Sequence, residues 1–362
     1  MIPTRQFHVF LIFCGLNILL PACSPQEQLN HKQSDNQNAA SPTSAAGDEE
    51  RVDVLFYIEG QLCQHLRKIY QDKSGVLWLG TNVYGLLNYD GDSLSYLKDI
   101  EGIAEGRITG IREDNKGNVW FSSSGGMTKF DGSTFTNFRE DEGRFNNEIW
   151  SFVIDKSGTF WLGTHEGVRL FDGESYTDFP IPKGQVRDTT SIISYDRVSS
   201  VLADSKGNMW FGTDGFGICK WNGVGFTNFT TDNGLCDNNI GDLFEDSSGN
   251  IWISTSYGGM CMFDGKSFRN FATEGLIDGV EAGAIYEDKR GNIWFAVEHH
   301  GVYKYDGESF VNYNEKDGLN TSGVLSIYQD REDRFWFGGW GGLFRFDGET
   351  FTSVTKDGPW ER

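Results

Sequence analysis

Short apolar segments separated by polar turns fill most of the chain, and one arrangement of them recurs at a nearly constant spacing. Each copy contains a tryptophan, an aspartate six residues before it, and an Asp-Gly or Asn-Gly pair eleven or twelve residues after it. A large apolar residue follows four positions beyond that Asp or Asn. Consecutive copies are 42, 41, 49, 42, 42 and 42 residues apart, measured between Trp78, Trp120, Trp161, Trp210, Trp252, Trp294 and Trp336.

The segment 324–354 shows which elements one copy predicts. Strands are expected at 325–329, 335–338 and 343–346, with a fourth near Phe351. The turn after the first strand reads Asp-x-x-Gly-Asn in 246–250, where the Asp side chain can cap the turn and the Gly can adopt a positive φ. Strands this short are not stable alone, so neighbouring copies must pack face to face.

A period of about 40–45 residues with four strands is typical of a propeller blade. We therefore predict an all-β fold, a seven-bladed β-propeller of four-stranded antiparallel blades. The Trp and Asp that recur in every copy are interpreted as packing and turn residues, because they serve what all blades share. Residues that bind a ligand are expected where the copies differ.

Residues 239–259 read Asn-Ile-x-x-Leu-x-Glu-Asp-x-x-Gly-Asn-Ile-Trp-Ile-x-Thr-x-x-Gly-Gly. This pattern resembles the two-component regulator propeller repeat, and its copies extend over residues 54–354. The resemblance implies the periplasmic sensor part of a hybrid histidine kinase, a domain that detects carbohydrate fragments. Only eight residues follow Val354, so we expect the sensor propeller alone, without a kinase domain.

The first 22 residues are expected to be a lipoprotein signal peptide. One cation, Arg5, precedes an apolar run over 7–20, which is too short to span a bilayer comfortably and fits a secretory signal. The run ends in Leu20-Pro21-Ala22-Cys23, which resembles a bacterial lipobox. The resemblance implies cleavage before Cys23 and attachment of diacylglycerol to its sulfur. Residues 23–50 are then a lipidated cysteine and a disordered tether, and residues 51–362 form the propeller.

The lipid on Cys23 is the one membrane contact that we expect, because no other stretch approaches about 18 consecutive apolar residues. Ser24 rather than Asp follows this cysteine, which by analogy favours the outer membrane. The expected location is the bacterial cell envelope, on the periplasmic or surface side of the outer membrane.

Composition excludes one class of partner. The chain has 31 Lys and Arg against 52 Asp and Glu, a net charge of −21, whereas phosphate binding needs clustered cations. Nucleic acid is therefore not expected as a partner. The 46 glycines fit repeated tight turns between strands. We expect a monomeric propeller without a cofactor.

The strand count predicts how the ring closes. A fourth-strand pattern follows all seven Asp-Gly or Asn-Gly turns, and a related stretch at 54–58 precedes the first copy. Eight candidates for seven places imply that the chain ends meet in one blade. Segment 52–58 or segment 350–354 is expected to complete the blade that contains Trp78.

Two sets of variable residues are expected at the mouth of the central channel, by analogy with WD-type blades whose innermost strand precedes the Asp turn. The first set stands four residues after each repeat Trp: Asn82, Ser124, His165, Asp214, Ser256, Glu298 and Trp340. The second stands seven residues before each repeat Asp: His65, Arg107, Glu148, Arg197, Asn239, Glu281 and Gly323.

These residues predict the kind of ligand. Arg, Glu and Asn supply hydrogen-bond donors and acceptors, and Trp340 can stack on a sugar face. We therefore expect the mouth to bind a small polar, carbohydrate-like ligand or a partner protein of the envelope. The interval of 49 residues places a longer loop at 180–197 on the same face. Deleting 184–191 is expected to weaken binding and to leave stability nearly unchanged.

Two other functions stay open. Streptogramin-type lyases are also seven-bladed, resemble this chain in Gly-Asn-x-Trp-Phe repeats, and use His and Glu of blade loops with a divalent metal. Glu298-His299-His300 and His165-Glu166 are the candidates for such chemistry here, but no other Glu-x-His pair matches the lyases. The second alternative is a pure protein-interaction scaffold whose acidic rim docks a basic partner. A binding module that is not an enzyme and holds no metal is the leading expectation.

The cysteines after Cys23 are expected to be free thiols. Cys219 and Cys261 stand at equivalent places in adjacent blades, where strands diverge too far for a disulfide. Cys63 and Cys236 fall in loops several blades apart.

Overall fold

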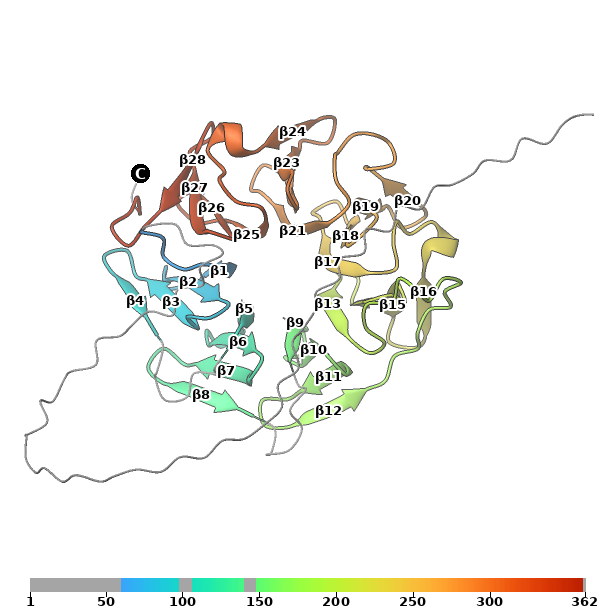
Figure 1. Cartoon of the computed structure of the whole chain (residues 1–362). Helices are drawn as coiled ribbons and strands as arrows, with labels where there is room; N and C mark the ends of the chain where they lie inside the picture. The colour runs from blue at the N-terminus through green and yellow to red at the C-terminus, as the bar shows by residue number, and fades with distance from the viewer. Residues whose placement is uncertain (1–59, 98–105, 140–147, 361–362) are drawn as a thin grey trace, which may run out of the picture. The chain divides into compact units, whose positions relative to one another are not determined.

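Seven four-stranded antiparallel sheets form a ring around a central space (Figure 1). The structure is a computed structural model that describes residues 60–97, 106–139 and 148–360. Contacts divide the chain into Met1–Arg51 and a second compact unit, Val52–Arg362, which holds every described strand. The predicted seven-bladed β-propeller is confirmed.

The blades follow one another along the chain, and each sheet has its strands in sequence order. Blade 1 contains β1 (Leu66–Gln71), β2 (Leu77–Thr81), β3 (Leu86–Tyr89) and β4 (Leu94–Tyr96). Blade 2 contains β5 (Ile108–Glu113), β6 (Val119–Ser123), β7 (Gly126–Phe130) and β8 (Phe135–Phe138). Blade 3 contains β9 (Ile149–Ile154), β10 (Phe160–Thr164), β11 (Gly167–Phe171) and β12 (Tyr176–Phe179). Blade 4 contains β13 (Val198–Ala203), β14 (Met209–Thr213), β15 (Ile218–Trp221) and β16 (Phe226–Phe229).

The last three blades have the same plan. Blade 5 contains β17 (Ile240–Glu245), β18 (Ile251–Thr255), β19 (Met260–Phe263) and β20 (Phe268–Asn270). Blade 6 contains β21 (Ala282–Glu287), β22 (Ile293–Val297), β23 (Gly301–Tyr305) and β24 (Phe310–Tyr313). Blade 7 contains β25 (Val324–Gln329), β26 (Phe335–Gly339), β27 (Gly342–Phe346) and β28 (Phe351–Val354). Two short 3-10 turns, Thr231–Asn233 and Glu315–Asp317, follow β16 and β24.

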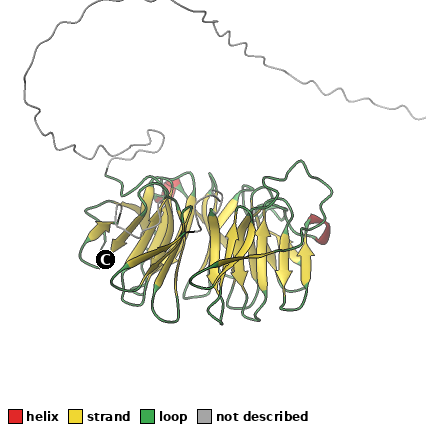
Figure 2. Ribbon diagram, turned by 90° about the horizontal axis from the view of Figure 1, so that it is seen from below, coloured by secondary structure: helices red, strands yellow, loops and turns green. Residues whose placement is uncertain are grey.

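The first strand of each blade is innermost, as predicted, because it contacts the first strands of both neighbouring blades. The second strand carries the repeat Trp and is buried along nearly its whole length. Both of its faces are covered by adjacent sheets, which explains why it is apolar without alternation. Figure 2 shows the strands running across the thickness of the ring, with loops on both faces.

The repeat Asp and the repeat Trp are partners in every blade. Each indole N–H donates to its aspartate at 2.7–2.9 Å. The other carboxylate oxygen accepts backbone N–H groups of the turn, and the turn glycine, such as Gly249 with φ 83°, adopts the left-handed conformation. The interpretation of these residues as structural is confirmed, and the spacing of six residues is the span of this hydrogen bond.

Each junction between blades contains one cluster of buried apolar side chains. Five of the junctions also share a polar contact: a Glu or Gln directly before the turn Asp accepts the backbone N–H of the turn in the preceding blade. These pairs are Glu113 with Lys73, Glu245 with Ser205, Glu287 with Ser247, Gln329 with Lys289, and Gln71 with Arg331.

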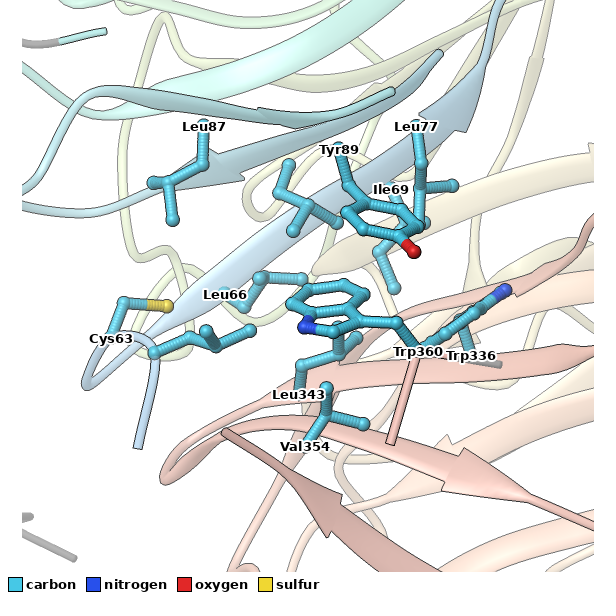
Figure 3. Packing of buried hydrophobic residues seen from close by; sticks show 12 residues of the cluster. Cys63, Leu66, Ile69, Leu77, Leu87, Tyr89, Trp336, Leu343, Val354 and Trp360 are labelled. Carbon is cyan, nitrogen blue, oxygen red and sulfur yellow. The ribbon is translucent and has the colours of Figure 1, made fainter. Parts of the chain in front are cut away.

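The predicted closure by strand exchange is wrong for 350–354, because this segment lies in β28 of blade 7. Segment 52–58 lies outside the described residues. Among the described residues, blade 1 has a fourth strand of its own, Leu94–Tyr96. Blades 7 and 1 meet through side chains and also through the backbone, which forms a bridge between Gln61 and Thr355. Figure 3 shows Trp336 and Trp360 among the apolar residues of this junction. The Trp360 ring stacks on Tyr89 with centroids 4.4 Å apart.

The prediction of four free thiols is also wrong. Cys236 and Cys261 form a disulfide with Cα atoms 6.1 Å apart. The segment that leads from blade 4 into blade 5 lies over the β18–β19 turn, so that a Cβ at Gly258 would be 2.6 Å from the Cys236 carbonyl oxygen. The partner of Cys261 is therefore not Cys219, at the equivalent place in the adjacent blade, but a cysteine of the connecting segment. Cys63 and Cys219 are free and buried, and burial raises the pKa of each thiol to about 12.

Among the described residues, no helix has both the length and the apolar character that crossing a membrane requires.

Candidate functional site

The two predicted sets of residues lie side by side on one face of the ring, which we call the mouth face. In five blades the backbone N–H of the residue after the Trp strand donates to the carbonyl of the residue before the inner strand, at 2.9–3.1 Å. The pairs are Asn82 with His65, His165 with Glu148, Ser256 with Asn239, Glu298 with Glu281, and Trp340 with Gly323. In blade 4 the Arg197 guanidinium pairs with the Asp214 carboxylate. The two sets of residues are therefore neighbours within their blades and lie at the same end of the blades, around the central channel.

The basic side of the mouth face is built around Trp150, the second residue of β9. The Arg107 guanidinium lies 5.2 Å from the Trp150 ring centroid, and the Arg197 guanidinium lies 4.6 Å from it. Arg107 also pairs with Glu148 at 3.1 Å. Three neighbouring blades thus contribute two guanidinium groups, an indole and two carboxylates to one cluster.

Two polar groups beside this cluster are buried without a hydrogen-bond partner among the described residues. These groups are the Trp150 indole N–H and the side-chain amide of Asn239. Asn239 is wholly buried and bridges to Asp214 through the backbone. An unsatisfied buried polar group costs about 1–3 kcal/mol, so both groups need an explanation beyond folding.

Asp214 is the buried carboxylate of the mouth face. Burial raises its pKa, while the charges of Arg197 and His165 oppose that shift. The electrostatic influence of His165, an exposed residue of blade 3, shows that the two blade ends are close enough to interact. The structure thus brings His165, Arg197, Asp214 and Asn239 into one region.

The opposite side of the mouth face is acidic. Partial desolvation raises the pKa of Glu281 to about 6, with help from a hydrogen bond to Glu298 and repulsion by its charge. The His299 imidazole lies 3.8 Å from the Glu298 carboxylate and acts against the shift. The Glu281 carboxyl therefore holds its proton more tightly than an ordinary glutamate does, and it lies three blades away from Arg107.

The remaining predicted residues lie around blade 1. The His65 and Trp340 rings meet edge-on with centroids 5.5 Å apart, and their backbones form a bridge between blades 7 and 1. Asn82 accepts a hydrogen bond from Arg67 at 3.4 Å. Burial lowers the pKa of Arg67 to about 10, repulsion by Arg107 adds to the shift, and Glu148 opposes it. Blade 1 is thus continuous with the basic side.

The lyase-like candidates do not gather in one place. His299 and His300 border a pocket of about 670 Å³ between blades 6 and 7, together with Asp278, Tyr303 and Thr321. His299 has a positive φ of 62° in the β22–β23 turn. In the part of the chain that the structure describes, no three His, Cys, Asp or Glu side chains are arranged to hold a metal ion.

The long loop 180–197 lies on the mouth face, as predicted, because the Ser194 N–H donates to the Asp214 carbonyl at 3.2 Å. The loop packs against blade 4, and a Cβ at Gly184 would be 2.4 Å from the Phe216 carbonyl oxygen. Deleting 184–191 is therefore now expected to lower stability as well. Tyr195 in this loop is 62 % exposed.

Sequence reasoning missed Trp150, although the sequence contains a signal for it. Seven of the eleven tryptophans belong to the repeat, and Trp150 is one of four that do not: Trp150, Trp221, Trp340 and Trp360. It stands on a predicted inner strand, where the other blades have Arg67, Thr109, Ser199, Gly241, Gly283 and Leu325. The tryptophan at this position departs from the other six blades, and this departure was the signal in the sequence.

A family model described as two-component regulator propeller matches five segments: 102–125, 143–166, 192–215, 234–257 and 318–341. Each segment runs from the residues before an inner strand to the turn after the Trp strand, as the blades of the structure do. Five of the seven blades thus match the two-component regulator propeller repeat. No curated protein matches the chain in sequence.

Solved structures share the fold of these two-component regulator propeller repeats. The extracellular domain of a protein described as a hybrid two-component system from B. thetaiotaomicron has a TM-score of 0.67 at 23% identity; the match covers 81% of this chain and 40% of that one. PorZ, a surface component of the type-IX secretion system of Porphyromonas gingivalis, has a TM-score of 0.58 at 13% identity, covering 81% and 48%. Virginiamycin B lyase from Staphylococcus aureus has a TM-score of 0.58 at 12% identity, covering 80% and 96%. The chain spans less than half the length of the first two proteins.

Proposed function

We propose that this protein is a cell-envelope sensor propeller that binds a small polar, carbohydrate-like ligand on its mouth face. The observation that carries the proposal is the placement of Trp150 between Arg107 and Arg197, with Asn239 buried nearby. Guanidinium and amide groups bond to hydroxyl and carboxylate groups, and the Trp150 ring holds the two guanidinium groups in place by cation–π contacts. The five blades that match the family model include the three that build this cluster.

The cluster does not serve the packing that the seven blades share. Every junction already has its own apolar core, and no other inner strand carries an aromatic residue at this position. The exposed aromatic side chains of Tyr195 and Tyr257 add apolar surface to the same face. The mouth face therefore combines polar groups and aromatic surface, as carbohydrate sites do.

Isothermal titration with a panel of neutral and acidic oligosaccharides tests the proposal. Trp150→Ala is expected to weaken binding of the active saccharide about tenfold or more, since it removes the ring that positions both the Arg107 and the Arg197 guanidinium groups. Phe226→Ala removes an exposed aromatic ring from the outer strand β16 and is the matched control. Absence of any saccharide binding, or equal affinity in both variants, would count against the proposal and favour a protein-docking scaffold.

The proposed location rests on the lipobox-like segment before Cys23. Cys23→Ser is expected to abolish incorporation of labelled fatty acid and to move the protein from the membrane fraction to the soluble fraction. Retention in the membrane without label would contradict the anchor. A monomer is proposed, and light scattering of the released protein measures its mass directly.

We propose binding without turnover. A bound saccharide is expected to be recovered unchanged after long incubation with Mg²⁺ as well as with a chelator. New products that require the metal and vanish in His299→Ala would instead establish the lyase-like alternative.

A further inference from the structure

A cavity of about 420 Å³ lies between the inner strands at the end opposite the mouth face, close to the Asp turns. It is bordered by strands of the first five blades, and its polar lining includes Lys68, Thr109, Arg112, Ser151 and Asp242. The residues that build the mouth face do not line it. This channel cavity is therefore a second place at which the molecule could hold a ligand.

Lys68 stands at a position that has a structural task in other blades. Four residues before the turn Asp, three blades carry a serine whose hydroxyl accepts the backbone N–H of the next blade at 3.1 Å. These contacts join Ser151 to Val201, Ser200 to Leu243, and Ser326 to Ile69. An ammonium group has no acceptor, so Lys68 cannot make this contact. Its presence is not explained by ring assembly.

Arg112 also departs from the repeat. Its position, two residues before the turn Asp, holds Tyr70, Tyr286 and Tyr328 in three other blades. Those rings pack against one another across the junctions between blades. The centroid of the Tyr328 ring lies 6.3 Å from that of Tyr70 and 6.0 Å from that of Tyr286. Blade 2 instead places a guanidinium beside the cavity. The Arg112 guanidinium donates a hydrogen bond to the adjacent carbonyl of Ile111, at 2.9 Å.

Neither cation has a direct counter-ion among the residues that the structure describes. None of the ion pairs between described residues involves Lys68 or Arg112. Asp242 attracts both from the other side of the ring, but its Oδ1 accepts the Ser200 hydroxyl at 3.1 Å and the Leu243 N–H at 2.9 Å.

The other two carboxylates at the cavity are held by neighbouring turns. Glu113 pairs with Lys73 at 3.1 Å and accepts its backbone N–H. Glu245 accepts both the N–H and the hydroxyl of Ser205. Lys68 is partly buried, whereas Arg112 is exposed to solvent beside the cavity. The neighbouring strands still lower the pKa of both groups by desolvation. Two charged donors in one cavity thus lack a close partner in a protein whose net charge is −21.

We propose that the channel cavity binds an anionic group, a carboxylate, sulfate or phosphate, between Lys68 and Arg112. The guanidinium of Arg112 offers paired N–H donors that match two oxygens of such a group, and the Lys68 ammonium adds a third donor and a second charge. The Thr109 and Ser151 hydroxyls stand on the same wall. Either a free inorganic anion or the acidic group of a saccharide satisfies this chemistry. The site is separate from the mouth face and does not depend on binding there.

Titration calorimetry on the full chain tests the site with three probes: sodium sulfate, sodium glucuronate and neutral glucose. Sulfate or glucuronate is expected to bind and glucose is not. Lys68→Met and Arg112→Met should each weaken anion binding about tenfold, the loss of one charge-assisted hydrogen bond. Lys116→Met removes an exposed cation on the same face of the ring, outside the cavity, and should leave the affinity within about twofold. Trp150→Ala should leave sulfate binding unchanged.

The outcomes separate the sources and decide the proposal. Tighter binding of sulfate identifies a free anion as the ligand, and tighter binding of glucuronate identifies an acidic saccharide. Both variants are expected to fold, since Arg112 is exposed and neither side chain forms an ion pair with another described residue; an unchanged near-UV spectrum and urea midpoint verify this. If Lys68→Met unfolds, Lys68→Gln and Arg112→Met carry the test. Absence of anion binding to the wild-type chain, or affinity unchanged in both cavity variants, overturns the proposal.

Discussion

The indole N–H of Trp252 donates to Oδ2 of Asp246 at 2.8 Å, and the same carboxylate also accepts the N–H groups of Ser248 and Asn250. The side-chain amide of Asn250 donates to it as well, at 2.9 Å. One aspartate therefore ties the turn at one edge of the blade to the tryptophan of the blade core. All seven blades contain this indole–carboxylate contact, so it is the repeated unit of stability in the ring.

Asp246→Ala is expected to lower the free energy of unfolding by about 2–4 kcal/mol. The substitution leaves the indole N–H of Trp252 and the turn N–H groups without their acceptor, and each unsatisfied buried group is costly. Urea unfolding followed by tryptophan fluorescence measures the change.

Asp264→Ala is the control for this prediction. Asp264 also caps a turn, but it is exposed and its donors, Lys266 and Ser267, are backbone groups that water can reach. Its loss should cost less than about 1 kcal/mol. Equal losses in the two variants would show that the indole contact adds nothing to the turn.

The spacing of Trp and Asp was enough to predict the fold, because a seven-bladed ring imposes the same packing on each copy. The paired sets on the mouth face followed from the same spacing, and the backbone bonds between Asn82 and His65 and between Glu298 and Glu281 confirm their placement. Because all seven blades share one plan, the position of a residue in one blade predicts the positions of its equivalents in the other blades.

Features that depend on contacts between non-equivalent positions could not be predicted in this way. The Cys236–Cys261 disulfide joins a connecting segment to a strand and has no counterpart in another blade. Arg107 and Arg197 meet at Trp150 because three consecutive blades each contribute a different side chain. The spacing of the repeat carries no information about such pairings.

The junction of blades 7 and 1 predicts a strong effect at Trp360. This side chain is buried, stacks on Tyr89, and lies 6.0 Å from the Trp336 ring. The described strands of these two blades pair within their own sheets, so apolar packing and the backbone bridges Gln61–Thr355 and His65–Trp340 together close the ring. Trp360→Ala is expected to cost about 3 kcal/mol by loss of a large buried ring. Thermal and urea unfolding measure it.

Trp360→Phe keeps an aromatic ring at the junction and should retain most of that stability. A loss below about 1 kcal/mol in Trp360→Ala would mean that the remaining apolar cluster and the Gln71–Arg331 contact suffice to close the ring.

The disulfide predicts a redox dependence of stability. Cys236 and Cys261 are 25 residues apart, and cross-linking a loop of that length removes unfolded-state entropy worth about 3 kcal/mol. Reduction with dithiothreitol should therefore lower the urea midpoint of the wild-type chain. The variant with Cys236→Ala and Cys261→Ala is less stable and should not respond to the reductant. An equal response in both proteins would assign the effect to something other than this bond.

The acidic side of the mouth face predicts a pH dependence that the variant Glu281→Gln removes. The folded-state pKa of Glu281 is about 6, above its ordinary value of 4.5, because of desolvation and the neighbouring Glu298. A raised folded-state pKa means that the folded protein binds the proton more tightly. The resulting stabilisation is complete below pH 4.5 and is lost as the pH rises through 6.

Urea unfolding at pH 4.5, 6 and 7.5 tests this relation against Glu281→Gln. Relative to the variant, the wild-type chain should lose at most about 1 kcal/mol between the lowest and highest pH, since solvent at the rim screens the pair. Glu298→Gln removes the other partner and should flatten the same dependence. A difference between wild type and Glu281→Gln that stays constant across this range would show that the pKa of Glu281 is not raised in the folded protein.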